Sequence, residues 1–290
     1  MNDNTYNRLS EDMQEIYVKY CLPDDLSGLT MDSVILSPKN KKKVDEFLIE
    51  TQYKKKFMSY GLKPVNRLIA SGASGTGKTF LAKCIAAAFG YELLAIDIAN
   101  ALSTGVAATA IKDIFSLGNE IGNAIIFLDE CDAIARSRED KSVPEDPNVR
   151  RANNAIFQQL DRMNPDCIFY AATNMFKELD TAFVSRFNVR MEFDRPPLDN
   201  IREALNKFLL SAFTIKEDMD PKLEEVILWH ARNYIGLSYR NMQTWVERAE
   251  KNAIIKGREY IFISEIFKYF MEEMRVEVGF KGDKPYLYQV

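Results

Sequence analysis

The stretch "GASGTGKT", residues 72–79, constrains this chain more than any other part of its sequence. It fits the pattern G-x-x-x-x-G-K-[ST] with Gly72, Gly77, Lys78 and Thr79 at the defined positions. Glycines let successive backbone N–H groups turn inward around an anion, because no Cβ atom stands in the way. An apolar run precedes the stretch and a helix-like run, "FLAKCIAAAFG", follows it, so the positive end of a helix dipole would face the same anion. The stretch therefore predicts a phosphate-binding loop between a strand and a helix.

Each residue type in this loop has a chemical role. The Lys78 ammonium would reach the β- and γ-phosphates of a nucleotide, and the Thr79 hydroxyl would ligate Mg²⁺. A glycine-rich turn that binds nothing is the alternative, and the flanking strand and helix patterns disfavour it. The residues expected to contact the nucleotide are Gly72, Ala73, Ser74, Gly75, Thr76, Gly77, Lys78, Thr79 and Phe80.

Around the loop, short apolar runs alternate with helical patterns. The first four runs are nearly continuous in apolar residues, which is typical of strands covered on both faces of a parallel sheet. We therefore predict an α/β fold, a doubly wound and mostly parallel sheet of five strands. The expected strands are 67–71, 91–98, 124–129, 167–173 and 189–193, and the expected helices among them are 79–89, 106–121, 148–163 and 179–186.

The pattern changes at "FDRPPLDN", where Pro196 and Pro197 end the last strand and helical periodicity follows. We place an N-terminal segment at 1–30, the α/β domain at 31–197 and a small all-helical domain at 198–278. Residues 279–290 are expected to form a loosely held tail.

The strand "AIIFLDE" supplies the second half of a phosphate site. It puts Asp129 at the carboxyl edge of the sheet, where ligands bind in open α/β sheets. Asp129 is expected to hold the Mg²⁺ shell. Glu130 would polarise a water for in-line attack on the γ-phosphate.

Composition excludes several other classes of function. The chain has 38 Lys and Arg against 42 Asp and Glu, so no global basic field points to nucleic acid. Its four cysteines lie far apart and its single histidine, His230, sits in an apolar helical stretch, which leaves no material for a zinc site or a His-based triad. The polar start and the absence of a run of about 18 apolar residues predict a soluble, cytoplasmic protein with no membrane partner. Two lysine clusters in a helix expected at 38–60 are either a solvated face or a patch for a partner or nucleic acid.

Taken together, these segments resemble an AAA+ ATPase of the classical AAA clade over roughly residues 30–275. "DECDAIARSR" is similar to that clade's extended Walker B segment, with Asp132 and Arg138 in the expected places. "AATN" resembles sensor 1, which implies that Asn174 hydrogen-bonds the γ-phosphate or the attacking water. "LDTAFVSRFNVRMEF" resembles the second region of homology, which implies that Arg186 reaches into the active site of the next subunit. Many relatives carry a second arginine where this chain has Ser185.

Other segments carry the resemblance less directly. "IGLSYRNM" resembles the start of the lid helix with sensor 2, with Arg240 near that position. "LTMDSVILSP" resembles the stretch whose backbone contacts adenine, which makes Val34 and Ile35 candidates. Three alternatives stay open: Asn174 as a turn cap, Arg186 as a surface ion-pair partner, and Arg240 without a nucleotide role.

One segment departs from the family's pattern. Threading relatives carry an aromatic residue just before a glycine in the stretch after the second strand, and these aromatics line the pore. Here the stretch is "IANALSTGVAAT", in which Ser103 and Thr104 precede Gly105 and Val106 follows it. No aromatic residue is available to grip a substrate. The second pore segment, about 139–148, is charged and proline-rich, typical of an exposed loop.

The resemblance implies a Mg²⁺-dependent ATPase that assembles with itself as a ring, with a hexamer expected. Its ATP hydrolysis would drive remodelling of a protein partner. The alternatives are an ATP-gated switch that assembles or regulates a partner without threading it, and a DNA-associated loader supported only by the lysine clusters.

Overall fold

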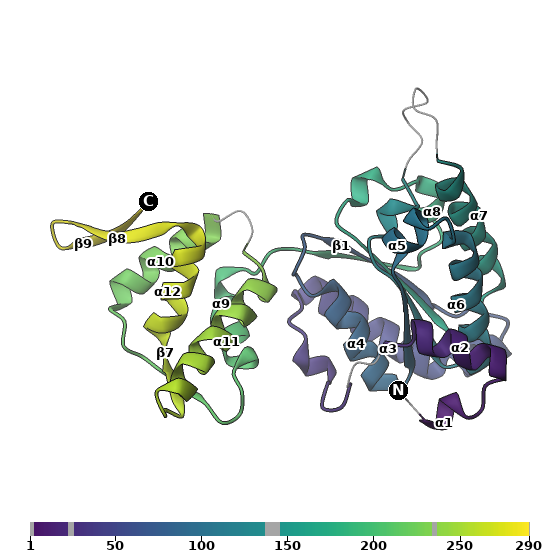
Figure 1. Ribbon diagram of the computed structural model, residues 1–290, viewed down its shortest axis with the longest axis horizontal. Coiled ribbons are helices and arrows are strands. Elements are labelled where there is room, and N and C mark those ends of the chain that lie inside the picture. The colour runs from purple at the N-terminus through teal and green to yellow at the C-terminus, as the bar shows by residue number, and fades with distance from the viewer. Residues whose placement is uncertain (1–2, 23–25, 137–145, 234–236, 290) are drawn as a thin grey trace. The chain divides into compact units, whose positions relative to one another are not determined.

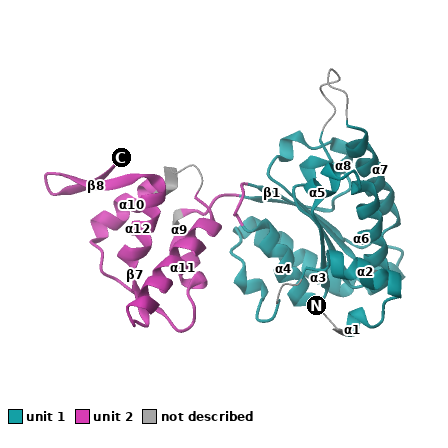
Figure 2. Cartoon of the chain, in the orientation of Figure 1, with its two compact units in different colours: residues 1–72, 77–193 teal, residues 73–76, 194–290 magenta. Residues whose placement is uncertain are grey.

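The chain divides into two compact units (Figure 2). The computed structural model describes residues 3–22, 26–136, 146–233 and 237–289. Unit 1 comprises residues 1–72 and 77–193, and unit 2 comprises residues 73–76 and 194–290.

Unit 1 is built on a five-stranded, fully parallel sheet with the strand order β2-β3-β4-β1-β5. This arrangement confirms the predicted α/β sheet, with each strand end within about three residues of its expected position. Because β1 lies between β4 and β5, and β4 lies beside β3, the ends of β1, β3 and β4 are neighbours. Figure 1 shows helices on both sides of this sheet. The strands are β1 Arg67–Gly72, β2 Glu92–Ile96, β3 Ala124–Leu128, β4 Ile168–Thr173 and β5 Val189–Phe193.

Successive residues of a strand point to opposite faces of the sheet and pack in two separate hydrophobic cores, one on each face. Leu68 of β1 packs in a cluster with Phe47 of α3 and Leu81 of α4. Its neighbour Ile69 packs in the other cluster, with Phe115 of α6. Helices therefore cover both faces, as a doubly wound sheet requires. The helices and 3₁₀ turns that follow α2 in this unit are η1 Met31–Ser33, α3 Pro38–Ser59, α4 Lys78–Phe89, α5 Ile98–Ser103, α6 Ala107–Ile121, η2 Cys131–Ala133, α7 Pro147–Arg162, η3 Phe176–Glu178 and α8 Thr181–Val184.

The N-terminal segment packs against the β2 edge of the sheet. It contains α1 Asp3–Tyr6 and α2 Glu11–Tyr20. The fully buried Tyr17 donates its hydroxyl to Glu92 Oε2 at 2.9 Å, and Cys21 forms an antiparallel bridge with Leu94. This bridge covers part of an otherwise unpaired strand edge.

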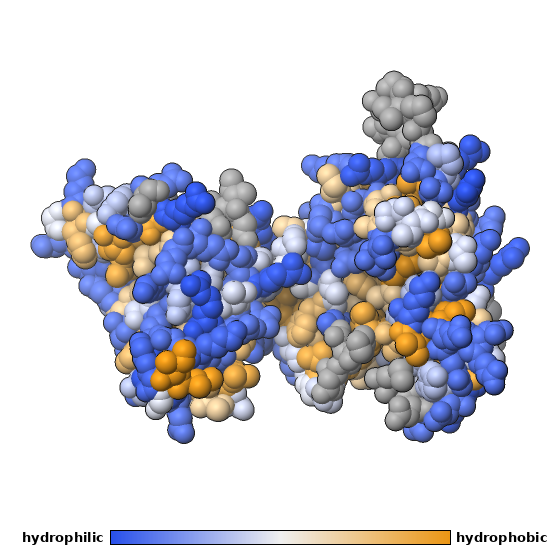
Figure 3. Space-filling view, viewed as in Figure 1, coloured by the Kyte–Doolittle hydropathy of each residue, from blue (hydrophilic) through white to orange (hydrophobic). Residues whose placement is uncertain are grey.

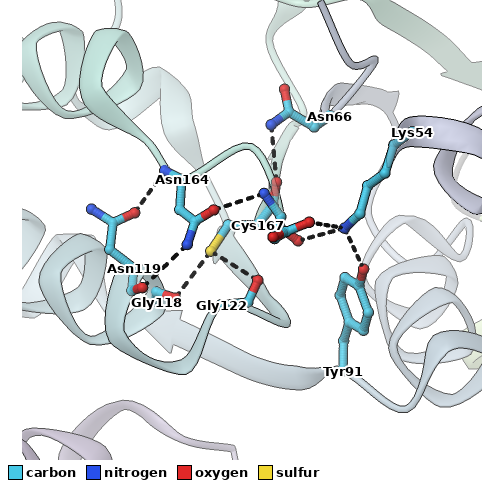
Figure 4. A network of polar contacts seen from close by, with 9 residues as sticks. Lys54, Asn66, Tyr91, Gly118, Asn119, Gly122, Asn164 and Cys167 are labelled. Atoms are coloured by element: carbon cyan, nitrogen blue, oxygen red, sulfur yellow. Dashed lines mark hydrogen bonds and ion pairs between the residues drawn. The ribbon is translucent and has the colours of Figure 1, made fainter. Parts of the chain in front are cut away.

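A polar network joins helix α3 to the start of β4 (Figure 4). Lys54 Nζ pairs with Asp166 Oδ1 at 2.8 Å and donates to Tyr91 Oη at 2.9 Å. Burial opposes the charge on Lys54, but its hydrogen bonds with Asp166 and Tyr91 favour the ammonium form. The pKa of Lys54 is therefore raised. Beside this pair, the Cys167 thiol donates to Gly118 O at 3.0 Å. One lysine of the second cluster is thus a buried structural cation rather than part of a solvated face.

Unit 2 is mainly helical, but it is not all-helical as predicted, because it also contains two small two-stranded sheets. Trp245 of α11 packs edge-on against Phe270 of α12 in its core. Strand β6 pairs in parallel with β7. The elements are α9 Leu198–Phe208, β6 Thr214–Lys216, α10 Pro221–Asn233, α11 Tyr239–Ile255, β7 Tyr260–Phe262, α12 Ile263–Met274, β8 Val276–Lys281 and β9 Lys284–Gln289.

The expectation of a loosely held tail at residues 279–290 is wrong. Strands β8 and β9 pair as an antiparallel hairpin with Val278 opposite Leu287. Leu287 is buried, so the alternating apolar residues of "KPYLYQ" anchor one face of the hairpin, a pattern that the short segment only weakly signals.

On the face seen in Figure 3, hydrophilic residues predominate and hydrophobic residues lie between them in small groups. Among the helices in the described parts of the chain, none combines the length and the apolar character needed to cross a membrane.

Candidate active site

Glycines frame the predicted phosphate-binding loop at both ends. Gly72 ends β1 with φ +143°, and a Cβ atom there would lie 2.1 Å from the carbonyl oxygen of Phe193. Gly77 is the N-cap residue of α4 with φ +102°. Any other residue at either position would be strained. Since Gly77 has no side chain to cap the helix, the first N–H groups of α4 can bind an anion.

The Lys78 ammonium joins the ends of two adjacent strands. Its Nζ donates to Gly72 O at 2.8 Å and to Asn174 Oδ1 at 2.8 Å. Gly72 ends β1, and Asn174 follows β4 directly. The lysine is nearly buried, with 6% of its surface exposed. The cation therefore lies where the two strand ends meet, in contact with the predicted sensor residue.

The buried Tyr170 contacts the backbone of Lys78, and the sequence analysis did not predict this contact. Its hydroxyl donates to Lys78 O at 2.9 Å. Burial raises the pKa of Tyr170 well above its ordinary value, so the hydroxyl stays protonated and remains a donor. A single tyrosine hydroxyl within the run "IFYAA" signals a polar group in a buried strand, but it does not identify the partner of that group.

Thr79 and Asp129 form the second part of the site. Thr79 Oγ1 donates to Asp129 Oδ2 at 3.1 Å. Hydroxyl and carboxylate oxygens are the ligands that Mg²⁺ takes when it keeps several waters and binds phosphate oxygens. The donor set thus fits a nucleotide-bound Mg²⁺.

Glu130 follows in an unusual backbone conformation. It has φ 49° and ψ 42°, in the left-handed region, and its N–H donates to Asp129 Oδ1 at 2.9 Å. A non-glycine residue in this region is strained, and such strain clusters at functional sites. Asp129 and Glu130 thus both lie in the turn that follows the carboxyl end of β3.

Residues 73–76 of the loop group with unit 2, where they contact the start of α11. Arg240 N donates to Gly75 O at 3.3 Å, and Arg240 Nη1 lies 3.4 Å from Ser74 Oγ. Thr76 Oγ1 donates to Ala73 O at 2.8 Å, which closes the loop on itself. The predicted sensor 2 residue therefore contacts the phosphate-binding loop directly.

Arg186 lies apart from the group around Lys78. Its guanidinium stacks over the Phe157 ring, with Cζ 4.2 Å from the ring centroid. Nη1 donates to Ala182 O at 2.9 Å, and Nε lies 3.8 Å from Asp161 Oδ1. These contacts lie between Arg186 and residues of α7 and α8. Among the described residues, Arg186 forms no such contact with Glu130 or Asn174.

The candidates for adenine contact have different environments. Val34 directly follows η1 and is buried in the core cluster that includes Leu81 of α4. Ile35 is half-buried, and Phe80 on the first turn of α4 is 36% exposed. The side chain of Val34 is thus committed to packing, so that its backbone is the part able to contact a base.

The segment expected to form the first pore loop is partly helical. Helix α5 runs from Ile98 to Ser103 with Asp97 as its N-cap, and Thr104 Oγ1 donates to Asn100 O at 2.8 Å. Val106 is 46% exposed. Arg138 and most of the second predicted pore segment lie outside the described residues.

Comparison with known proteins shows what this chain is similar to. Residues 68–195 match the family described as "ATPase family associated with various cellular activities (AAA)". An uncharacterized AAA family ATPase of Sinorhizobium fredii is 28% identical over 86% of this chain and 72% of its own length. A proteasome-activating nucleotidase of Aeropyrum pernix is 30% identical over 78% of this chain and 55% of its own length. An ATP-dependent zinc metalloprotease of Homo sapiens is 26% identical over 84% of this chain, which spans 31% of the relative.

Proposed function

We propose that this chain, which is similar to ATPases of the AAA family, hydrolyses Mg²⁺-bound ATP between the subunits of a homo-oligomeric ring. The observation that carries the proposal is the contact of Lys78 Nζ with both Gly72 O and Asn174 Oδ1, each at 2.8 Å. It brings the phosphate-binding lysine to the end of the strand that carries the sensor. Asp129 and Glu130 lie at the end of the next strand in the sheet.

Each group then has a defined task. Lys78 binds the β- and γ-phosphates, while Thr79 and Asp129 would hold Mg²⁺, which would neutralise charge on the phosphate oxygens. Glu130 accepts the proton of the attacking water as the water oxygen bonds to the γ-phosphorus and the β–γ bridging bond breaks. Since Asn174 Oδ1 accepts from Lys78, its Nδ2 is the end that donates to the γ-phosphate or to the water.

Arg186 is proposed to complete the site of a neighbouring subunit. Its side chain is 29% exposed, and its ionic partner Asp161 is 63% exposed. An ion pair this exposed contributes little, about 0–1 kcal/mol. For the guanidinium to reach a neighbour's γ-phosphate, its contacts with the Phe157 ring and Ala182 O would also have to break. A guanidinium supplied in trans stabilises charge in the transition state. This requirement is why we propose a ring, and a hexamer as its size.

We expect Arg186→Ala to bind ATP in its own subunit yet lose hydrolysis. Mixed with Lys78→Ala, it should recover part of the activity, because each variant supplies the group that the other lacks. The measurement is phosphate release from mixtures whose mixed composition is verified by native mass spectrometry. Arg162→Ala, an exposed arginine of the same helix as Asp161, is the matched control and should behave as the parent. If verified mixed rings recover no ATPase activity, the proposal that Arg186 acts in the site of a neighbouring subunit is contradicted.

We further propose that hydrolysis remodels a protein partner. Two relatives support this proposal: one is an ATP-dependent zinc metalloprotease and the other a proteasome-activating nucleotidase. Remodelling by this chain would need a grip on the partner that residues 98–107 do not offer. Val106 is exposed, but Ser103 and Thr104 donate their hydroxyls to carbonyls of their own helix.

We therefore expect ATP hydrolysis without processive unfolding of a generic folded substrate by this chain alone. Burial of one bulky apolar side chain contributes roughly 1.5–3 kcal/mol, and here only the isopropyl group of Val106 and the methyl group of Thr104 are available beside Gly105. The measurement uses a fluorescent folded protein with an unstructured tail, mixed with the protein and ATP. Loss of fluorescence that depends on ATP and disappears in Glu130→Gln would overturn this expectation and indicate a threading unfoldase. Stable fluorescence during hydrolysis would favour the ATP-gated switch, our second candidate.

A nucleic-acid loader has less support. Within the lysine clusters, Lys54 is buried and paired with Asp166, so it adds no charge to a basic surface. Lys42 lies 4.0 Å from Glu46. Cytoplasmic localisation remains part of the proposal.

A further inference from the structure

One hydroxyl group joins the segments that carry Glu130 and Asn174. Thr173 is the last residue of β4 and is 1% exposed. Its Oγ1 donates to Asp132 Oδ1 at 2.7 Å and accepts from Met175 N at 2.9 Å. Because the hydroxyl proton and a lone pair are both engaged, this side chain fixes the chain on both sides of Asn174.

Asp132 ties this hydroxyl to the turn after β3. It lies in η2, Cys131–Ala133, two residues after Glu130. The turn is closed by a hydrogen bond from Ala133 N to Glu130 O at 2.9 Å. A displacement of Asp132 would therefore move the backbone of Glu130, which is held in a strained conformation.

We propose that Thr173 and Asp132 are positioning residues for ATP hydrolysis: their hydrogen bond sets Asn174 relative to Glu130. This inference rests on the roles proposed above for Glu130 and Asn174. Neither Thr173 nor Asp132 touches the substrate. They act by keeping the amide of Asn174 against Lys78 while the carboxylate of Glu130 faces the same water. Small errors in such positions reduce turnover strongly without weakening ground-state binding.

Thr173→Val removes the hydroxyl while keeping the shape of the side chain. We expect kcat to fall by about tenfold or more, with the Kd for ATP changed by less than about twofold. Thr173→Ser should restore kcat to within about threefold of the parent, because it keeps the donor and the acceptor. Thr51→Val, at a buried threonine of α3, is the matched control and should leave kcat unchanged.

Asp132 variants separate the hydrogen bond from the charge and cover the case in which Thr173→Val does not fold. Asp132 is only partly buried, so its truncation is better tolerated. Asp132→Asn keeps an acceptor oxygen for Thr173 and should retain most of kcat, whereas Asp132→Ala should lose as much as Thr173→Val. Loss of activity in Asp132→Asn equal to that in Asp132→Ala would contradict a role through the hydrogen bond.

The decisive test is whether Thr173 acts through Asn174. Single-turnover phosphate release is measured for Thr173→Val, Asn174→Ala and the double variant, because this assay resolves slow rates. We expect the double variant to be no slower than Asn174→Ala alone. A further loss of about tenfold, the additive result for independent effects, would overturn the inference, as would normal kcat in folded Thr173→Val. Normal turnover in Asn174→Ala would overturn it together with the proposed role of Asn174. The ATPase proposal itself would then be decided separately by Glu130→Gln.

Discussion

Glu130→Gln should bind ATP with the affinity of the parent and hydrolyse it at least about a hundredfold more slowly, because an amide cannot accept the proton of the attacking water. The substitution keeps the size of the side chain. It also leaves intact the backbone bond from Glu130 N to Asp129 Oδ1 and the contact of Thr79 with Asp129. ATP and Mg²⁺ binding should therefore survive, and the ATP-bound oligomer should accumulate.

The measurement pairs equilibrium binding of ATP with steady-state phosphate release. Size-exclusion chromatography in the presence of ATP follows the accumulation of the oligomer. A variant that turns over at more than about a tenth of the parent rate would remove Glu130 from the role of general base, given the size of the effect expected.

Lys78→Ala should nearly abolish ATP binding, with an increase in Kd of at least about a hundredfold, or about 2.7 kcal/mol. The loop loses the ammonium that lies between Gly72 O and Asn174 Oδ1. Charge-assisted hydrogen bonds to phosphate are about twice as strong as neutral ones, and backbone N–H groups alone cannot replace them.

Isothermal titration with ATP and Mg²⁺ measures this loss, with a thermal melt to verify that the variant folds. The matched control is Lys112→Ala, which removes an exposed lysine from α6 and should leave the affinity unchanged. Near-normal affinity in folded Lys78→Ala would mean that the phosphate site lies elsewhere.

The sequence predicted the sheet and the groups at its carboxyl edge because both depend on local patterns. Nearly continuous apolar runs marked the strands, and polar residues directly after them marked Asp129 and Asn174. In a parallel sheet these strand ends share one edge. The contact of Lys78 with Asn174 follows from the strand order, in which β1 and β4 are neighbours.

The remaining features depend on contacts between distant segments, which periodicity does not encode. The residues around Tyr170 do not indicate that its hydroxyl donates to Lys78 O. Those around Tyr17 likewise do not indicate that its hydroxyl donates to Glu92. The bond between Thr173 and Asp132 likewise joins residues 41 positions apart. The contact of Arg186 with Phe157 could not be predicted either, because a half-buried arginine can pair with any of several neighbours.

The central claim is that ATP is hydrolysed at a site completed by a neighbouring subunit. It is tested most directly by the rate of phosphate release per subunit at saturating ATP and Mg²⁺, measured over a wide range of protein concentration. We predict that this rate rises with concentration in parallel with oligomer formation and is absent from Glu130→Gln at every concentration. A rate per subunit that stays constant down to the monomer, or hydrolysis that persists in Glu130→Gln, would contradict the account.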